Sequence, residues 1–521
     1  MARTYESALR HLDSIQSNRA ITSLFTPPSP LPGQPSPSPQ DLNAQAIPEM
    51  LAWAQRAGLT QQVLSKLRYI HVAGTKGKGS VCAYLTSILT SPNSNTGTGI
   101  SGIASVAGKV GTYTSPHLLS VRERIQLNGS PISQELFARY FFEVWDALTA
   151  AARAEALAQA NQGGKEVSEE EITGPASKPF YFRFLTLLAL HAFVREGVTS
   201  AVIECGIGGE YDSTNILPQG AVTAAVVAQL GVDHVGMLGG TVPEIAWNKA
   251  GIMKRGVRCF TRKLEGKDGI GEATMKVLRE RAAEKKALLV EIEDREVEEW
   301  GGVRGDGVGS LEGEFQKYNQ ALAVMAAGEH LRILEGKPDT QSSEAKLSVL
   351  GERFSERLRL ARLRGRCETR QEDNFSWFID GAHTADSLEE AAKWFAAKRK
   401  ALPSETKVVL LFNQQERDVT RLLGGLLGES TIFDYALFTR NEIQRRTENE
   451  PERDLSVQQA AQDAMQQLCP MTASTIVDNV GEAVNKIKEL QSDGEKVAVL
   501  ATGSLHLVGA LLRTLEPDAG R

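Results

Sequence analysis

The feature that most constrains the fold is a glycine-rich loop at residues 74–80, with the sequence Gly-Thr-Lys-Gly-Lys-Gly-Ser. An apolar run at 69–73 precedes the loop, and a helix-like stretch at 81–89 follows it. Strand, loop and helix start form a phosphate cradle, because glycines let backbone N–H groups approach an anion and the helix N-terminus adds positive potential. Lys78 supplies charge, and Ser80 supplies a hydroxyl for a phosphate-bound Mg²⁺. Nucleotide-dependent chemistry is therefore the first hypothesis.

The spacing within this loop departs from the usual P-loop. Only two residues separate Gly74 from Gly77, and Gly79 stands between Lys78 and Ser80. A lone glycine turn is weak support for phosphate binding, but a preceding strand, a following helix and the lysine and serine inside the loop favour it together. The shortened spacing limits the number of protein families to which a loop of this kind can belong.

Length and composition limit the remaining possibilities. A chain of 521 residues is too long for one core, so two or three domains are expected. The net charge of −6 and the lack of a long basic block argue against nucleic acid as a partner. The five scattered cysteines form no CxxC pattern and are typical of reduced thiols in a cytoplasmic protein.

The sequence also bears on membranes and targeting. No apolar stretch is long enough to span a bilayer, so we expect no integral membrane association. Residues 1–16 carry acidic side chains and are typical of a short amphipathic helix rather than a secretory signal or a transit peptide. We expect a cytoplasmic location, and a mitochondrial isoform with a longer N-terminus stays open.

From residue 69 onward, short apolar runs alternate with helical periods, which indicates a largely parallel α/β sheet. The predicted strands are 69–73, 109–113, 201–204, 222–229 and 256–261, and the predicted helices are 80–89, 133–150, 182–195 and 242–252. A second α/β unit follows a polar segment at 336–345, with predicted strands at 374–379, 407–412, 434–438 and 497–501. Segments 159–176 and 301–313 are predicted to be surface loops. The seven prolines of 27–39 predict an exposed, irregular insertion.

The predicted fold class is α/β. An N-terminal P-loop-type domain with a mostly parallel sheet spans residues 1–345 and includes the insertion. A smaller C-terminal Rossmann-like α/β domain spans 346–521.

Polar side chains follow several predicted strands, where ligand sites of open α/β sheets concentrate. Ser115, Glu204 and His234 all lie at such strand ends. A buried carboxylate is costly unless it is paired or bound to a cation, so one interpretation is a Mg²⁺ held by these residues and by nucleotide phosphates. The alternatives are a serine-proline turn, a salt-bridged or capping glutamate and a structural histidine, since imidazole is an unusual ligand for Mg²⁺.

Four further residues allow both a structural and a functional interpretation. Lys249 lies in an apolar helix, where a lysine usually directs its amine to solvent. Asp380 could hold a ribose or cap a helix, and His383 could meet a phosphate or be a surface histidine. Arg366 could pair with a phosphate or be solvated. Because both domains contribute strand-end groups, we expect an active site in the interdomain cleft.

The ordered set of motifs resembles the folylpolyglutamate synthase family of the Mur ligase superfamily. The matching stretches are 74–80, 115–118, 122–125, 204–209, 230–234, 380–383 and 502–507. The resemblance runs from about residue 5 to 516, and Asp-Gly-Ala-His-Thr at 380–384 is similar to the eukaryotic, fungal-like branch.

This resemblance implies an ATP-dependent ligase of one-carbon metabolism. Such an enzyme adds L-glutamate to the γ-carboxylate of tetrahydrofolate and its polyglutamates through an acyl phosphate, and releases ADP and phosphate. The implied cofactors are ATP and Mg²⁺, with K⁺ as a possible monovalent cation. The implied partners are small-molecule substrates, and we expect a monomer.

The resemblance also implies roles for individual residues. The implied ATP-binding residues are Gly74, Thr75, Lys76, Gly77, Lys78, Gly79, Ser80, Arg366 and Asp380. Ser115, Glu204 and His234 would ligate Mg²⁺. Lys78, Lys249 and His383 would be catalytic, Lys249 as a lysine that can be carbamylated. Arg124, His383 and Arg417 would bind substrate, although Gln415 and Glu416 replace the start of the family's Gly-Asp-Arg-Asp stretch before Arg417.

Other activities share these motifs. A dihydrofolate synthase, or a bifunctional enzyme, is the nearest alternative, because the motifs do not separate the two activities. A Mur-type peptide ligase is disfavoured by the folate-type loop around Arg124. A non-catalytic P-loop module would leave the motifs of the second domain unexplained.

Overall fold

The computed structural model describes residues 3–16, 43, 45–90, 101–163, 167–266, 269–305, 308–337, 346–414, 418–428, 432–444, 453–491 and 495–517. The chain forms two compact units. Unit 1 comprises Met1–Pro116, Arg122–Gly302 and Lys317–Leu358, and unit 2 comprises His117–Val121, Val303–Gln316 and Arg359–Arg521. The single boundary expected after residue 345 therefore differs from this division, which returns the chain to unit 2 twice before Arg359. The predicted insertion at 27–39 and most of the polar segment at 336–345 lie outside the described residues.

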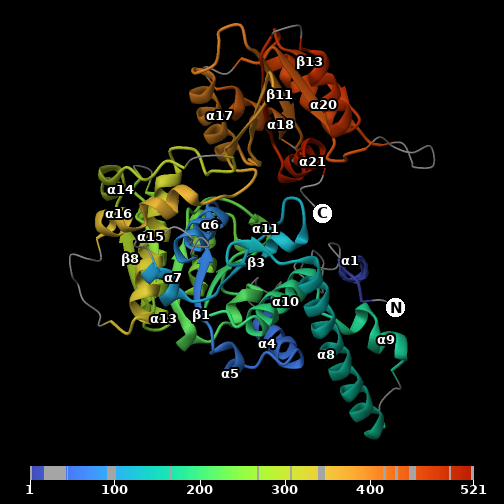
Figure 1. Ribbon diagram of the computed structural model, residues 1–521, viewed down its shortest axis with the longest axis vertical. Coiled ribbons are helices and arrows are strands. Elements are labelled where there is room, and N and C mark those ends of the chain that lie inside the picture. The colour runs from blue at the N-terminus through green and yellow to red at the C-terminus, as the bar shows by residue number, and fades with distance from the viewer. Residues whose placement is uncertain are drawn as a thin grey trace, which may run out of the picture. The chain divides into compact units, whose positions relative to one another are not determined.

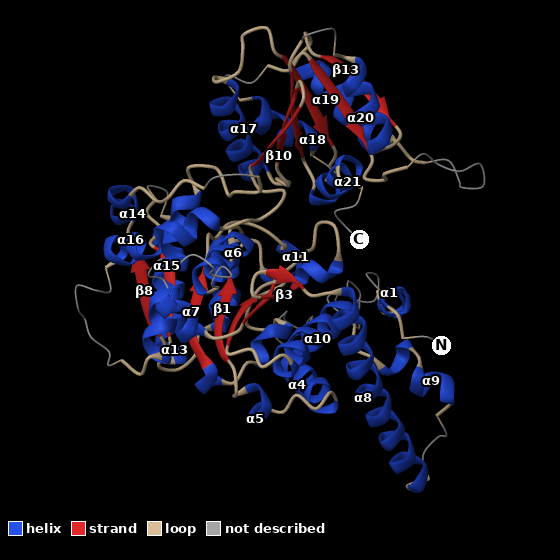
Figure 2. Ribbon diagram, in the orientation of Figure 1, coloured by secondary structure: helices blue, strands red, loops and turns tan. Residues whose placement is uncertain are grey.

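Unit 1 contains an eight-stranded sheet in the order β4-β3-β2-β5-β1-β6-β7-β8. The strands are β1 Arg68–Ala73, β2 Val110–Tyr113, β3 Ile125–Leu127, β4 Ser130–Pro131, β5 Ser200–Glu204, β6 Val222–Val227, β7 Arg258–Arg262 and β8 Leu288–Ile292. All neighbours from β2 to β8 pair in parallel, and β3 and β4 add an antiparallel edge. The strands of this sheet lie among helices in Figure 2.

Helices make up most of the remainder of unit 1 (Figure 1). They are α1 Tyr5–Ser14, α4 Ala46–Arg56, α5 Gln61–Leu64, α6 Lys78–Leu89, α7 Ser101–Ala107, α8 Gln134–Asn161, α9 Glu169–Thr173, α10 Tyr181–Arg195, α11 Val235–Leu238, α12 Val242–Lys249, α13 Ile270–Lys285, α14 Asp294–Trp300, α15 Gln316–Leu334 and α16 Leu347–Leu360. The 3₁₀ turns are η1 Val121–Arg124, η2 Pro175–Ser177, η3 Ser213–Ile216, η4 Gln219–Ala221 and η5 Ala250–Ile252.

Unit 2 contains a six-stranded sheet in the order β13-β12-β11-β14-β10-β9. Its strands are β9 Glu368–Glu372, β10 Phe375–Ile379, β11 Lys407–Phe412, β12 Tyr435–Thr439, β13 Ala473–Val477 and β14 Val497–Thr502. Its helices are α17 Ala385–Arg399, α18 Val419–Leu427, α19 Ser456–Leu468, α20 Val480–Glu489 and α21 Leu505–Leu515. Only the edge strand β9 pairs antiparallel within this sheet of described residues.

The central strand β11 shows why this sheet is covered on both faces. Val408, Leu410 and Phe412 pack in the core formed with α17, α18 and α19. Val409 and Leu411 pack in the core formed with α20 and α21. Alternate side chains of a strand point to opposite faces, so a strand buried on both faces is a continuous apolar run. The sequence Lys-Val-Val-Leu-Leu-Phe meets this requirement.

The α/β class with two parallel-rich sheets is confirmed, and every predicted strand occurs within two residues of its expected bounds. One prediction was wrong in part. Segment 159–176 is not a continuous surface loop, because it contains the end of α8, helix α9 and most of η2. Ser168 and Glu171 form a capping box that begins α9, and the alanine-rich continuation of α8 favours helix beyond residue 150.

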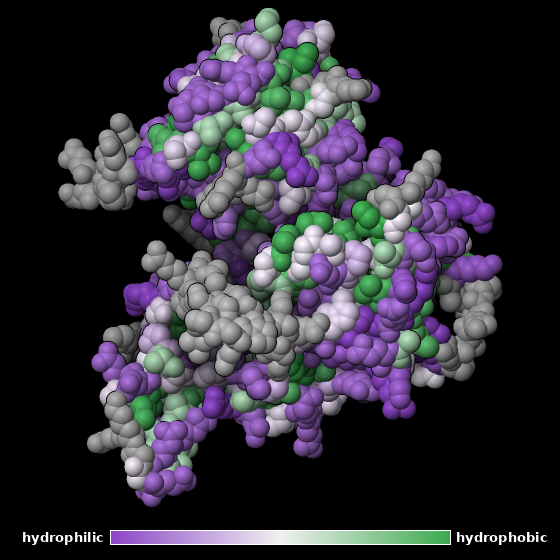
Figure 3. Space-filling view, turned by 180° about the vertical axis from the view of Figure 1, so that it is seen from behind, coloured by the Kyte–Doolittle hydropathy of each residue, from purple (hydrophilic) through white to green (hydrophobic). Residues whose placement is uncertain are grey.

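The surface agrees with this burial pattern. On the face of the molecule shown in Figure 3, hydrophilic residues predominate, and hydrophobic residues form smaller groups between them. In the described part of the chain, no helix combines the length and the apolar character that a membrane span requires. The five cysteines, all described, are free thiols.

Candidate functional site

The glycine loop connects β1 to α6 and depends on two glycines. Gly74 has φ +151° and Gly77 has φ +81°, and Gly77 is the N-cap of α6. A Cβ at Gly74 would lie 2.8 Å from Cβ of Ala228, and one at Gly77 would lie 2.3 Å from Oδ1 of Asn319. Both positions therefore require glycine for backbone conformation, and Gly74 requires it for space as well, because it lies against the backbone of Ala228.

The loop is attached to the segment that follows β6. The backbone N–H groups of Thr75 and Lys76 both donate to the carbonyl of Gln229, at 2.8 and 3.1 Å. The Thr75 hydroxyl donates to the Gly231 carbonyl at 3.0 Å and accepts from the Gly231 N–H at 3.2 Å. These bonds hold the loop after β1 beside the loop that carries His234.

Two lysines converge on one backbone carbonyl of the glycine loop. Lys78 Nζ donates to the Gly74 carbonyl at 3.0 Å, and Lys249 Nζ donates to the same oxygen at 2.8 Å. Lys249 is the last residue of α12 and is only 2% exposed, so its amine does not reach solvent as a snorkelling lysine would. Burial and then the charge of Lys78 lower the pKa of Lys249 to about 7.

Glu204 and Ser115 meet at the carboxyl end of β5. Glu204 is 3% exposed, and its Oε2 accepts a hydrogen bond from the Ser115 N–H at 3.1 Å. In the parallel register Glu204 is the partner of Val72 in β1, two residues before the glycine loop. Ser80, in the first turn of α6, is 6% exposed. The sheet thus places the Glu204 carboxylate and a serine beside the glycine loop.

His234 has a different environment from Glu204. It adopts a left-handed conformation with φ +50°, and its side chain is 45% exposed, with Nε2 3.6 Å from a carboxylate oxygen of Asp233. Among the described residues, no three His, Cys, Asp or Glu side chains are grouped to hold a metal ion. The oxygen atoms of Glu204 and Ser115 suit a hard cation such as Mg²⁺, which usually keeps waters and substrate phosphates as its other ligands.

A buried polar network, which the sequence did not reveal, supports the loop after Glu204. Asp212 Oδ2 accepts from the N–H groups of Gly206 and Ile207 at 2.9 and 3.0 Å, and Oδ1 accepts from Thr214. Burial raises the pKa of Asp212. His71 Nε2 lies 2.8 Å from the Thr214 hydroxyl, and burial lowers the pKa of His71 to about 3. The one feature of the sequence that could have indicated this network is Asp212 itself, a carboxylate in the glycine-rich loop two residues before Thr214.

Arg124, at the end of η1, is the predicted substrate residue of unit 1. It is 9% exposed, and its guanidinium lies 5.4 Å from the centre of the Tyr181 ring. This distance is that of a cation–π contact, so the largely buried arginine packs against a residue of α10.

In unit 2, Asp380 fixes two loops. Its Oδ2 accepts from the Cys367 N–H at 2.7 Å, and its Oδ1 accepts from the Ala382 N–H at 2.8 Å. Asp380 is 7% exposed and does not cap α17, because the N-cap is Thr384. The helix-cap interpretation of Asp380 is therefore wrong. Its carboxylate holds the turn that contains Arg366.

Arg366 and His383 lie on the loops that Asp380 joins. Arg366 is half-buried, and a Cβ added at Gly381 would lie 2.8 Å from its Nη1. His383 is exposed, with Nδ1 3.0 Å from the Gly381 carbonyl, and its own carbonyl accepts from Gln414 Nε2 at 2.9 Å. Arg417 lies outside the described residues.

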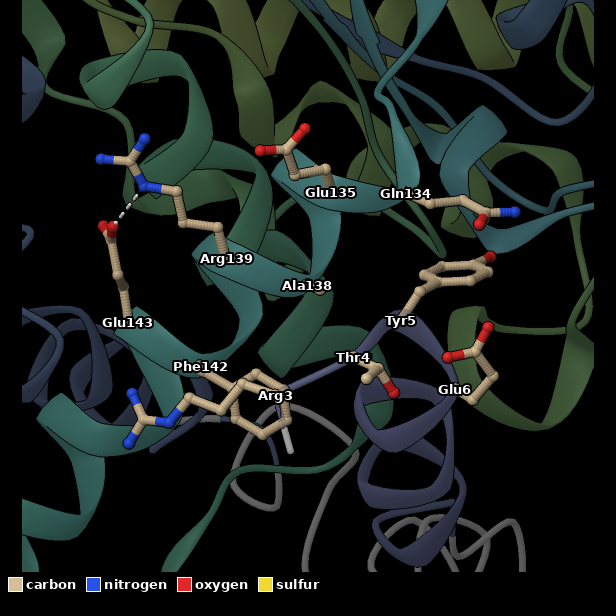
Figure 4. A pocket seen from close by; sticks show the side chains of 10 residues that line it. All are labelled: Arg3, Thr4, Tyr5, Glu6, Gln134, Glu135, Ala138, Arg139, Phe142 and Glu143. Atoms are coloured by element: carbon tan, nitrogen blue, oxygen red, sulfur yellow. Dashed lines mark hydrogen bonds and ion pairs between the residues drawn. The ribbon is translucent and has the colours of Figure 1, made fainter. Parts of the chain in front are cut away.

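A pocket elsewhere in unit 1 contains none of the predicted site residues. It lies between the start of α1 and the first turns of α8, and Arg3, Tyr5, Glu135 and Arg139 are among its lining residues (Figure 4). Arg139 is paired with Glu143, at 3.1 Å, within the same lining. We assign no ligand to it.

The chain is similar in sequence to several known proteins. A sequence model described as dihydrofolate synthetase, C-terminal domain, matches residues 363–514. A folylpolyglutamate synthase of Neurospora crassa is 37% identical over 543 residues, covering 99% of this chain and 92% of the relative. A folylpolyglutamate synthase of Saccharomyces cerevisiae (strain FostersO) is 36% identical over 529 residues, covering 98% of this chain and 87% of the relative.

A solved structure supports the fold. The Mycobacterium tuberculosis folylpolyglutamate synthase complexed with ADP and AMPPCP aligns with a TM-score of 0.63 at 23% identity, covering 90% of this chain and 95% of that chain. Since two curated relatives exceed 35% identity over nearly the full length, this chain belongs to the folylpolyglutamate synthase family of ligases.

Proposed function

We propose that this protein adds L-glutamate to the γ-carboxylate of tetrahydrofolate and its polyglutamates, with ATP as the energy source and ADP and phosphate as products. The observation that carries the proposal is the 37% identity to a folylpolyglutamate synthase across 99% of the chain. The phosphate loop, with Lys78 at its centre, supplies the physical means of holding ATP.

The proposed chemistry follows from the poor reactivity of a carboxylate. A γ-carboxylate oxygen of folate attacks the γ-phosphorus of ATP, and ADP leaves. The glutamate nitrogen then attacks the carbonyl carbon of the acyl phosphate, loses a proton, and phosphate leaves with the former carboxylate oxygen. Neither step needs a protein nucleophile, so the protein contributes mainly charge stabilisation and positioning.

In unit 1 we assign the phosphates of ATP to the loop of Gly74, Thr75, Lys76, Gly77, Lys78, Gly79 and Ser80. Lys78 and Lys249 now share the Gly74 carbonyl as acceptor. We propose that an incoming phosphate replaces this carbonyl as the partner of Lys78, because a phosphate oxygen is the stronger acceptor for an ammonium group. A lysine with a pKa near 7 is also partly neutral at physiological pH, as the carbamylation of Lys249 requires.

Mg²⁺ belongs to this proposal, with Ser115, Glu204 and His234 as its candidate protein ligands. When bound, the ion neutralises phosphate charge. The buried Glu204 carboxylate and the serine fit such an ion, whereas the exposed imidazole of His234 fits it less well. Dependence on K⁺, a cytoplasmic location and a monomeric state are further parts of the proposal.

In unit 2 we assign Arg366 and Asp380 to the nucleotide and His383 to the reacting phosphate and the incoming glutamate. Arg124 of unit 1 and Arg417 are assigned to substrate carboxylates or to folate. Asp380 acts through the turn it holds, since both of its carboxylate oxygens already accept backbone hydrogen bonds.

Dihydrofolate synthesis is the second candidate activity. It is favoured by the match of residues 363–514 to the model of a dihydrofolate synthetase C-terminal domain. Purified protein is incubated with ATP and glutamate plus either tetrahydrofolate or dihydropteroate. Turnover of tetrahydrofolate alone supports the first proposal, and turnover of both substrates indicates a bifunctional enzyme. Turnover of dihydropteroate alone contradicts the first proposal.

A further inference from the structure

A buried guanidinium on α13 contacts both segments that flank the lysine site. The Arg281 side chain is 4% exposed, and its Nη2 donates to Oε2 of Glu210 at 2.5 Å. The Cζ atom of Arg281 lies over the Trp247 ring, 4.2 Å from its centre. Lys285, one turn further along α13, donates to Oε1 of Glu210 at 3.0 Å. Arg281 therefore touches the loop that follows Glu204 and the helix that carries Lys249.

The loop and the end of α12 are in contact at the level of their backbones. The Glu210 N–H donates to the Asn248 carbonyl at 2.8 Å. A Cβ at Gly209 would lie 2.7 Å from the Lys249 carbonyl, and a Cβ at Gly251 would lie 2.3 Å from Cα of Glu210. Because no side chain separates these backbones, a shift of Glu210 moves the backbone on either side of Lys249.

We propose that Arg281 is a positioning residue for Lys249. By pairing with Glu210 and making a cation–π contact with Trp247, it holds the loop after Glu204 against the end of α12 and keeps the Lys249 amine on the Gly74 carbonyl. This proposal rests on the proposed function, because it gives the lysine its role in the reaction. A buried ion pair contributes little net stability, since desolvation offsets the attraction, but it specifies one arrangement.

The test compares two arginines of α13. Arg279 pairs with Glu272 and Glu291, and its side chain is 42% exposed, so Arg279→Met is the matched control for Arg281→Met. Each variant reacts with a water-soluble acetylating reagent, and peptide mass analysis gives the rate at Lys249. Lys178, which is 6% exposed and lies before α10 in the same unit, is the internal control for general loosening.

In Arg281→Met we expect acetylation of Lys249 to be at least about fivefold faster, with Lys178 unchanged. We also expect kcat to fall roughly tenfold with a smaller change in the KM for ATP, since small misplacements of a reacting group are costly. Arg279→Met should match the wild type in each measurement. Arg281→Lys, which keeps the charge but not the guanidinium group, should restore part of the protection of Lys249 against acetylation.

Equal acetylation of Lys249 in both variants, or an equal rise at Lys178, would overturn the proposal. If Arg281→Met does not fold, Glu210→Gln removes the carboxylate that pairs with both Arg281 and Lys285 at nearly constant size, and faster acetylation of Lys249 is again expected. Acetylation needs no turnover, so it tests Arg281 independently of the activity. Absence of glutamate-dependent ADP formation by the wild type would contradict the proposed function instead.

Discussion

The glycine loop of unit 1 and the Asp380 turn of unit 2 both follow a parallel strand, yet they use their charged side chains differently. In unit 1, Lys78 and Lys249 direct two amines at one carbonyl. In unit 2, Asp380 directs both carboxylate oxygens at backbone N–H groups of its own neighbourhood. Charged side chains near a loop that follows a strand can thus share one backbone acceptor, as the two lysines do, or hold the loop itself, as Asp380 does.

The two lysines and Asp380 differ in how well their charges are stabilised by their neighbours. Two cations on one neutral acceptor repel each other, and the lowered pKa of Lys249 reports that burial and repulsion make its charged form unfavourable. A carboxylate with two N–H donors is satisfied and gains stability from them. Substitutions in unit 1 should therefore affect catalysis most, and substitution of Asp380 should affect stability most.

The largest expected effect is that of Lys78→Ala. Loss of the amine that meets the ATP phosphates should reduce kcat/KM by roughly 100- to 1,000-fold. The free energy of unfolding should change little, because Lys78 loses one bond to a carbonyl that Lys249 also contacts. Steady-state kinetics and urea unfolding measure the two effects. A near-normal kcat/KM would contradict the role of the glycine loop.

Lys249→Ala should lower kcat by about 100-fold if the lysine organises the reacting phosphate. Short carboxylic acids should restore part of this loss if the carbamylated form is active, since they replace the missing carboxylate. Failure of every such acid to rescue the variant would leave Lys249 a structural role only. Rates with and without added acetate or formate measure the rescue.

The pKa of Lys249 also predicts how stability depends on pH. The unfolded chain holds the proton up to about pH 10.4. In the folded protein, burial lowers the pKa of Lys249 to about 7. The unfolded state binds more protons between these values, so this lysine makes the free energy of unfolding rise from pH 7 to 10. In Lys249→Met that rise should be smaller, and an identical pH profile in both proteins would contradict the lowered pKa.

Asp380→Asn should sharpen the contrast between the two units. The amide can accept only one of the two N–H groups, and the other is left facing an NH₂, at a cost of about 1–3 kcal/mol. We expect a lower midpoint of unfolding for unit 2, together with a fall in activity through the displaced Arg366. A variant with unchanged stability would show that the carboxylate does not stabilise the turn around it.

The smallest expected effect is that of His234→Ala. An exposed imidazole near one edge of the proposed Mg²⁺ site should raise the Mg²⁺ concentration for half-maximal rate by only about threefold, because one weak ligand is lost from a mostly oxygen-based shell. A metal titration of initial rates measures this change. An unchanged titration would remove His234 from the set of ligands.

Local patterns made the glycine loop and the strand ends predictable. Apolar runs, glycines and the strand-to-helix order of residues 69–89 lie within one short segment, so their arrangement follows from neighbouring residues. The helix α9 was predictable too, since Ser168 and Glu171 form a capping box, but the polar composition of the segment suggested a loop.

Long-range contacts could not be read from the sequence. The bond from Lys249 to Gly74 joins residues 175 positions apart, and the bond from Arg281 to Glu210 joins residues 71 apart. Each depends on how α12 and α13 pack on the sheet, which no local pattern encodes. The role of Asp380 depends in the same way on the pairing of β9 with β10, which brings Cys367 beside the carboxylate.

In the proposed reaction, this protein forms an amide between folate and glutamate at the expense of ATP. The direct measurement is mass analysis of the products from tetrahydrofolate, ATP and isotopically labelled glutamate. We expect folate species that are heavier by successive labelled glutamyl residues, with one ADP formed for each addition. ADP formation without any labelled folate, or in the absence of glutamate, would contradict it.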